Sequence, residues 1–267
     1  MLVLALDTTT RRGSLALARD GVLLEVSAGD EELTHAARLP GDLLRCLERH
    51  GLGVPDVDLF AVAAGPGSFT GLRIGIATIQ GLAFAGRRPV VAVSALDALA
   101  HAAAGQMPSG SGLIGAWMDA HRREVYACLY RKAERPSGTP VVPGPAGVAS
   151  AADLGDLQVV SAAEVRPPEA VVESWVPKLD GHVVMLGDGA TTYRELLLER
   201  MGQQVTIMEH PLIAAVVAEI ATSRAGLGQT IQPHAIRPFY VRRPDAELER
   251  DRRARASRTG SEPGGVS

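Results

Sequence analysis

A glycine-rich turn between an apolar run and a long helical pattern constrains the fold of this chain more than any other feature. Residues 58–64 form an apolar run typical of a buried strand, and the turn GPGS at 65–68 leads into a helical pattern over 70–85. A further apolar run over 89–93 predicts another buried strand. Strands that alternate with helices in this way indicate an α/β sheet rather than a helical bundle or a sandwich.

The first 50 residues continue the same alternation. An apolar run over 2–6 predicts a buried strand that ends at Asp7, and the runs over 14–19 and 22–27 predict a hairpin around the dipeptide Asp20-Gly21. A leucine-rich helical pattern follows. Gly51 is its stop signal, and Pro40 is expected to bend or divide the helix.

Glycine, serine and proline over 105–112 predict a hinge, which divides the chain into a first lobe, 1–104, and a second lobe, 105–246. The second lobe is less regular. It contains three strand patterns and one alanine-rich helical pattern, at 113–119, 124–130, 183–186 and 211–224. A Pro, Gly and Ala-rich stretch over 136–152 predicts a long surface loop, and residues 247–267 predict a disordered tail.

Composition narrows the class of protein. The 267 residues are 46% hydrophobic and carry a net charge of -3, which is typical of a soluble globular protein. The opening apolar run ends after Leu6, too short for a signal-peptide core or a membrane span, so we expect a cytoplasmic protein without a membrane partner. Cys46 and Cys128 lie far apart, which argues against a disulfide framework or a cysteine zinc site.

The charge pattern does not favour a protein that binds nucleic acid alone. The chain is slightly acidic, only 4% of its residues are aromatic, and its basic pairs are scattered along the sequence. If the protein serves RNA, we expect it to do so through a complex.

The turn at 65–68 and the helix after it allow several interpretations. Ser68 or Thr70 can cap the helix, and a helix N-terminus of this kind can hold an anion, although no Walker motif is present. Gly71, Gly75 and Thr78 lie near one helix face, which predicts close packing. The partner that packs against that face could be either another subunit or the protein's own sheet. The segment 119–124 likewise predicts either a polar rim of a cleft or a simple turn.

Several stretches together resemble one family. The stretch GPGSFTGLRIGIATIQGLAF resembles the signature of the TsaB (YeaZ) family, and LALDTTTRRGSLAL, WMDAHRREVYACLY, MLGDGA and RPFYVRRPDAE occur in the family's order. They span nearly the whole chain, except for the region 136–177 and the tail. The resemblance implies an α/β fold like that of actin, Hsp70 and sugar kinases (the ASKHA fold), with two related lobes.

The same resemblance implies a subunit without catalytic residues, metal or cofactor. The catalytic relative, TsaD, follows its glycine-rich signature with two metal-binding histidines, whereas the matching positions here are Ala95 and Leu99, which cannot bind a metal. Asp7, Thr8 and Thr9 match the place where actin-like ATPases meet magnesium and phosphate. The resemblance implies that in this subunit they line a degenerate nucleotide cleft.

Family membership further implies a dimerisation subunit that activates a TsaD-type transferase, which forms threonylcarbamoyladenosine beside the anticodon of tRNA. A TsaE-type ATPase would join through the complex, and tRNA would be reached indirectly. The family's interface maps onto two helices of the first lobe, and we expect contact residues at His35, Leu39, Leu43, Leu47, Gly71, Gly75, Thr78 and Leu82.

Two alternatives compete with this interpretation. One is an enzyme of the actin-like fold, either a protease, as the resemblance to a family once described as glycoproteases implies, or a kinase or ATPase, which Asp7 and the threonines after it would serve. The other is a self-associating protein, since the same helices could pair in a homodimer.

Overall fold

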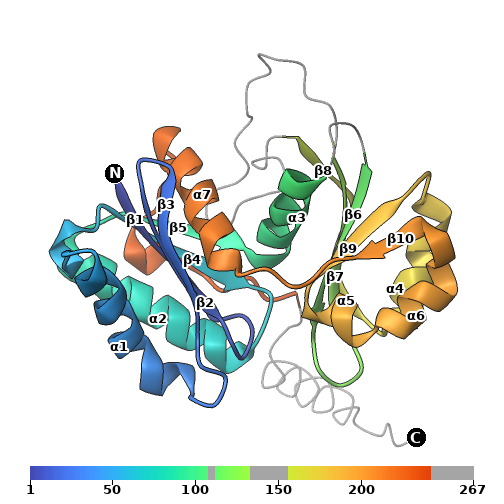
Figure 1. Cartoon of the computed structure of the whole chain (residues 1–267), viewed down its shortest axis with the longest axis horizontal. Coiled ribbons are helices and arrows are strands. Elements are labelled where there is room, and N and C mark those ends of the chain that lie inside the picture. Colours follow the sequence, from blue (N-terminus) through green and yellow to red (C-terminus); the bar gives the residue numbers. More distant parts are fainter. Residues whose placement is uncertain (108–111, 133–155, 242–267) are drawn as a thin grey trace, which may run out of the picture.

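The structure is a computed structural model that describes residues 1–107, 112–132 and 156–241. Within these ranges the chain forms two lobes, each built on a five-stranded sheet (Figure 1). The first sheet has the strand order β3-β2-β1-β4-β5. Its strands are β1 Leu2–Asp7, β2 Ser14–Arg19, β3 Val22–Ala28, β4 Leu59–Gly65 and β5 Val90–Ser94.

The second sheet repeats the topology of the first. Its strand order is β10-β9-β6-β7-β8. In each sheet the first strand in sequence pairs antiparallel with the second and parallel with the fourth. The predicted α/β fold with two related lobes is therefore confirmed. The strands are β6 Gly112–Asp119, β7 Val125–Lys132, β8 Leu157–Arg166, β9 Val183–Leu186 and β10 Val205–Ile207.

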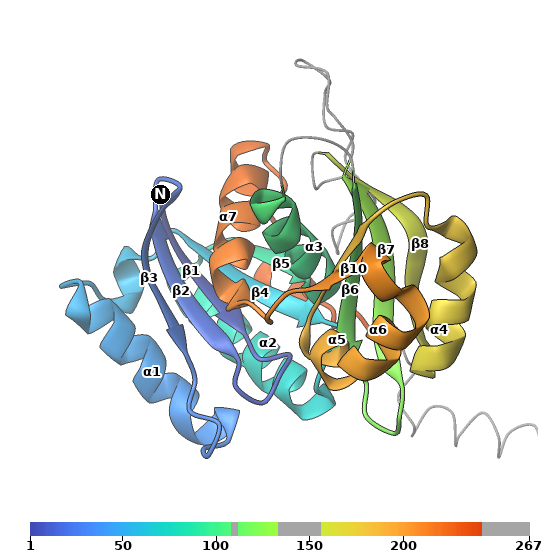
Figure 2. The ribbon, with the colours of Figure 1, turned by 45° about the vertical axis from the view of Figure 1, so that its right-hand side comes forward.

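Helices cover both faces of the first sheet (Figure 2). The helices α1 (His35–Arg49) and α2 (Phe69–Gly86) bury most of their leucines and isoleucines against one face. The helices α3 (Ala95–Gln106) and α7 (Ile213–Gly226) pack on the other face with small alanine-rich surfaces. Helix α1 is one continuous helix with Pro40 inside it, so of the two predicted effects of Pro40, a bend or a division, the structure excludes the division.

Helix α3 joins the two lobes. It contacts strands of both sheets, and one hydrophobic cluster runs from Val3 and Ala5 of the first sheet through Leu99 to Ile114 and Leu186 of the second. The outer face of the second sheet is covered by α4 (Pro168–Trp175), α5 (Asp188–Thr192) and α6 (Arg194–Met201). Because the shared core is continuous, the lobes are packed onto each other rather than linked by a free hinge.

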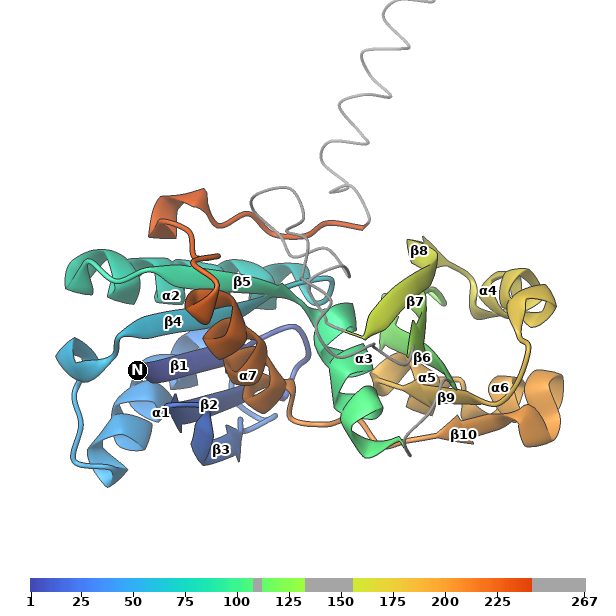
Figure 3. The same cartoon turned by 90° about the horizontal axis from the view of Figure 1, so that it is seen from above.

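The chain returns to the first lobe after the second sheet. Helix α7 packs on β1 and β2, and Ile231 pairs with Val90 at the outer edge of β5. This corrects the predicted boundaries over the described residues, because residues 213–241, predicted to be part of the second lobe, pack on the first. Sequence order cannot show such a return, since α7 has the apolar pattern of any buried helix. We call residues 231–241 the C-terminal strap; Figure 3 shows it in red-orange alongside β5 and α2.

Local predictions about turns and caps are confirmed. Asp20 and Gly21 both have positive φ in the hairpin turn, and Gly51 has a φ of +66° just after α1. Ser68 caps α2 by accepting a hydrogen bond from the Gly71 N–H at 3.2 Å. The predicted loop at 136–152 and the predicted tail at 247–267 lie outside the described residues. None of the helices in the described ranges is long and apolar enough to cross a membrane.

Candidate functional site

The loop after β1 turns its polar groups inward. Asp7 is 2% exposed, and its carboxylate accepts hydrogen bonds from the main-chain N–H of Thr9 at 2.8 Å and from the Thr9 hydroxyl at 2.6 Å. The hydroxyl of Ser14 donates to the same carboxylate at 3.4 Å. Thr8 is fully buried, and its hydroxyl has no hydrogen-bond partner among the described residues. The Asp7 carboxylate is thus largely engaged by its own loop.

Two cavities meet beside this loop, between the lobes. The larger has a volume of about 520 Å³ and is lined by Thr9, the first turns of α1 and α2, and Asp119, His121 and Asp188 of the second lobe. The smaller, of about 270 Å³, is lined by Asp7 and His210. Thr10, Arg11 and Asp188 line both cavities. Of the predicted cleft residues, Thr9 and Asp7 therefore each line a cavity, while Thr8 lines neither.

The second lobe supplies an acidic wall to this cleft. The Asp188 carboxylate accepts hydrogen bonds from the N–H groups of Asp119, at 3.0 Å, and Gly189, at 2.9 Å. Burial raises the pKa of the Asp188 carboxyl, because the ionised form loses water. His121, Arg122 and Arg123 all have positive φ in the turn between β6 and β7. The segment 119–124 is thus both a turn and part of the rim of the cleft.

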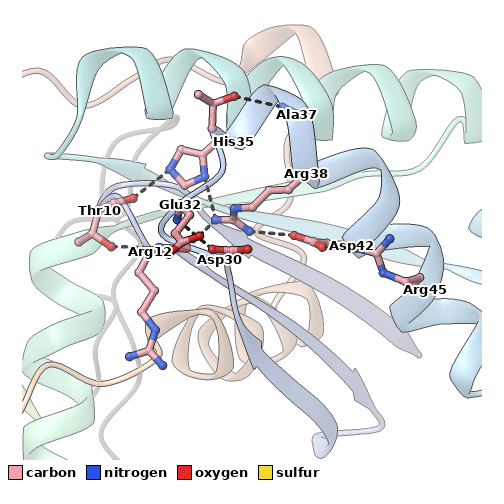
Figure 4. A network of polar contacts seen from close by, with 11 residues as sticks. Thr10, Arg12, Asp30, Glu32, His35, Ala37, Arg38, Asp42 and Arg45 are labelled. Atoms are coloured by element: carbon pink, nitrogen blue, oxygen red, sulfur yellow. Dashed lines mark hydrogen bonds and ion pairs between the residues drawn. The ribbon is translucent and has the colours of Figure 1, made fainter.

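A buried polar network holds the first-lobe wall of the cleft (Figure 4). The His35 Nε2–H donates to the Thr10 carbonyl at 2.9 Å, so Nδ1 is left to accept a hydrogen bond from the Arg38 guanidinium at 2.9 Å. Arg38 also donates to the Arg12 carbonyl at 2.5 Å and to the Asp42 carboxylate at 2.9 Å. These contacts tie the loop after β1 to helix α1.

His35 is neutral in this arrangement. Burial lowers the pKa of His35, and the neighbouring Arg38 charge lowers it further, while the hydrogen bond to the Thr10 carbonyl acts in the opposite direction. Neither this role of His35 nor the part played by Arg38 was predicted from the sequence. The available signal was two charged or polar residues, at His35 and Arg38, on the face of α1 that carries Leu39 and Leu43.

Most of the predicted interface residues are buried inside the chain, which corrects that prediction. Leu39, Leu43 and Leu47 are at most 3% exposed and pack in the core under α1. Their helical spacing marks the face of α1 that packs on its own sheet. His35 is held in the network described above. Thr78 and Leu82 are part-exposed on α2.

Gly71 and Gly75 serve internal packing. A side chain at Gly71 would overlap the main-chain oxygen of Thr8, and one at Gly75 would overlap the Thr8 hydroxyl. Helix α2 can therefore approach the end of β1 only because these positions lack a Cβ atom. The small helix face predicted from the sequence is real, but it packs on Thr8, in the loop directly after the protein's own first strand. Gly81, in contrast, has nothing within 4 Å of its Cβ position.

The positions that match the metal ligands of the catalytic relative lie in the hydrophobic core. Ala95 and Leu99 are both fully buried in α3. Across the described residues, no group of three or more His, Cys, Asp or Glu side chains is placed to hold a metal ion.

Two lobes of one topology, joined by a shared helix and separated by a cleft, define the actin-like class of two-lobed α/β proteins. Solved structures agree. A YeaZ structure from Pseudomonas aeruginosa matches 90% of this chain and 99% of its own, with a TM-score of 0.66 and 29% identity. A second Pseudomonas aeruginosa structure, described as similar to peptidase YeaZ, matches the same shares with a TM-score of 0.68 and 30% identity.

Sequence comparisons point to a single family. The family profile of TsaD, tRNA N6-adenosine threonylcarbamoyltransferase, matches residues 31–250. The tRNA threonylcarbamoyladenosine biosynthesis protein TsaB is 38% identical in Haemophilus influenzae, over 47% of this chain and 52% of that protein, and 37% identical in Escherichia coli, over 50% and 57%. The chain thus aligns with little more than half the length of these relatives. An uncharacterised Mycobacterium tuberculosis protein is 35% identical over 62% of this chain and 80% of that protein.

The chain belongs to this family, and within it to the TsaB (YeaZ) group.

Proposed function

We propose that this protein is a non-catalytic subunit of the machinery that forms threonylcarbamoyladenosine in tRNA, and that it pairs with a TsaD-type transferase through the outer surface of α1 and α2. The relatives named TsaB support the pathway. The internal hydrogen bonds of Asp7 support a subunit without catalysis of its own. A TsaE-type ATPase would join this pair within the larger complex.

The observation that carries the proposed interface is the exposed crest of α2. Thr70, Ala77 and Gly81 lie on the side of the helix opposite its buried face, and all three are exposed. Small side chains there let a partner helix approach closely. Thr78 and Leu82 of α2 are part-exposed, and Leu44, 50% exposed, adds apolar surface on α1.

Depletion of the protein from cells tests the pathway. Mass spectrometry of tRNA nucleosides should show loss of threonylcarbamoyladenosine on depletion and its return when a rescuing copy is expressed. Unchanged modification after complete depletion would refute the pathway. Magnesium-dependent ATP turnover by the purified chain would then favour the kinase or ATPase alternative.

A single arginine tests the interface. Gly81→Arg should abolish co-purification with the TsaD-type partner, because a long charged side chain would occupy the crest. The fold should survive, since the Gly81 Cβ position is open. Gly181→Arg is the matched control, because Gly181 is equally open but lies in the second lobe, and it should pair normally. Normal pairing by a folded Gly81→Arg variant would show that the interface lies on another surface. Light scattering, which measures the molar mass of each variant in solution, would show whether a homodimer uses the same crest.

A further inference from the structure

The face formed by α2 and the C-terminal strap carries arginines and no carboxylates. Asp and Glu are absent from residues 59–96 and 220–241, the two stretches that contain α2 and the strap. The exposed charged side chains in these stretches are Arg73, Arg87 and Arg237. Arg88, in contrast, is paired with Asp58 at 3.6 Å. Because the whole chain has a net charge of -3, this face has the opposite sign to the protein as a whole.

Three flat side chains are stacked on this face. The Arg73 guanidinium lies 4.0 Å from the centre of the Phe69 ring. The Tyr240 ring lies 5.7 Å from the Phe69 ring, centre to centre, with 30° between their planes. The Arg73 Nε–H also donates to the Tyr240 hydroxyl at 3.5 Å. Residues 167 positions apart in sequence thus form one cluster.

Main-chain contacts of the strap hold this cluster in place. Ile231 exchanges two hydrogen bonds with Val90, at 2.9 and 3.0 Å. The Gln80 side chain donates to the Pro233 carbonyl at 2.9 Å, and the Phe239 N–H donates to the Ala64 carbonyl at 2.7 Å. The strap therefore runs beside α2 toward its first turn (Figure 3). Tyr240 reaches Phe69 already ordered, so a ligand that stacks there would not need to order it.

The aromatic rings of this face are open to solvent. Phe69 is 43% exposed and Phe84 is 77% exposed. Phe84 follows Phe69 by 15 positions, which correspond to about 22 Å along the helix. The face thus combines exposed rings with arginines over a length that several nucleotides could follow. In RNA, phosphates carry negative charge that pairs with arginines, and bases have flat faces that stack on aromatic rings. The arginines of this face have no Asp or Glu partner within the two stretches, so a ligand with phosphates complements their charge.

We propose that this face binds RNA directly, with bases stacked on the cluster of Phe69, Arg73 and Tyr240 and phosphates paired with Arg87 and Arg237. The identification of that RNA as tRNA rests on the proposed function. The sequence alone favoured indirect contact, because its basic residues are scattered and its aromatic residues few. The fold brings together those that lie on α2 and on the strap.

The proposal is tested by the binding of fluorescently labelled tRNA to the full chain, alone and paired with its transferase, across a range of salt concentrations. Tyr240→Ala and Phe84→Ser should each lower the affinity about tenfold, as expected for loss of one stacking surface. Arg87→Glu should lower it at least as much and should flatten the salt dependence, because a phosphate contact is lost. Phe84 is so exposed that Phe84→Ser should leave the fold intact. Arg200→Glu, an equal change of charge on the exposed face of α6, is the control.

Crosslinks from 4-thiouridine-containing tRNA to Phe69, Phe84 or Tyr240 would add direct support. Wild-type affinity in all three folded variants, or an equal loss in Arg200→Glu, would overturn the proposal. So would variants that lose only their pairing with the transferase, since the face would then bind protein. If the RNA-binding proposal fails, depletion of the protein should still cause loss of threonylcarbamoyladenosine. The failure of one proposal can therefore be distinguished from the failure of the other.

Discussion

Replacing Gly71 with alanine is expected to lower the free energy of unfolding by about 1–3 kcal/mol, because the added methyl group would overlap the main-chain oxygen of Thr8. That oxygen belongs to the buried main chain directly after β1 and cannot move aside as the end of a flexible side chain could. Urea unfolding measures the effect as a lower midpoint at an unchanged slope. The sign of this change in the free energy of unfolding is informative, because replacing glycine with alanine inside a helix otherwise stabilises the fold.

Gly81→Ala is the matched control in the same helix. Its Cβ position is open, so the substitution should raise the free energy of unfolding by about 0.5–1 kcal/mol through helix propensity alone. Opposite signs at Gly71 and Gly81 would establish that the small face of α2 packs internally. Equal stabilisation at both positions would mean that α2 does not approach β1 as closely as described.

Removing the Arg38 guanidinium is expected to cost about 2–3 kcal/mol of folding free energy. Arg38→Ala leaves the Arg12 carbonyl, the His35 Nδ1 and the Asp42 carboxylate without their shared donor. Arg38 is 6% exposed, so water cannot readily replace it. Arg45→Ala is the control, because Arg45 bonds the other oxygen of Asp42 from a 61% exposed position and should change stability little. Equal effects of the two substitutions would show that the buried network does not hold the loop.

The same network predicts loss of stability in mild acid. The pKa of His35 is lowered in the folded chain, so the neutral ring stabilises the fold fully above the unfolded pKa near 6.5, and this contribution is lost as the pH falls through the folded value. Protonation would place an N–H group of the ring against the Arg38 guanidinium. The negative charge of Asp7, which lies nearby, raises the pKa of His35 and so opposes the lowering by burial and by Arg38. In His35→Gln, which cannot titrate, the difference in free energy of unfolding between pH 7.5 and 5.5 should be smaller than in the wild type.

The sequence predicted the first lobe better than the second. The runs at 2–6 and 58–64 are continuous and apolar because β1 and β4 are buried on both faces between helix layers. In the second lobe, β8 (Leu157–Arg166) is half-exposed along most of its length and has no clear period. It was not predicted. The short β10 gave no signal either, since three residues are too few to show an alternation.

The residues of the candidate site were likewise predicted only in part from the sequence. Asp7, Thr9 and Ser68 were identified because each follows a strand or precedes a helix, where local hydrogen bonds explain its residue type. For Asp188, the sequence showed only a position in the motif MLGDGA. Its place opposite Thr10 depends on how the lobes pack around α3, which no local pattern encodes.

The sequence by itself determined the alternation of strands and helices, the caps and turns, and the family, because these depend on neighbouring residues and on motif order. Tertiary structure decided which side of each helix faces the core. It buried Leu39 and Gly75, which the sequence offered as contact residues, and left Gly81 and Phe84 exposed. It also returned α7 and the strap to the first lobe, where Tyr240 meets Phe69. An apolar or small residue has the same local pattern whether it packs on its own sheet or on a partner, so only the position of the sheet distinguishes the two.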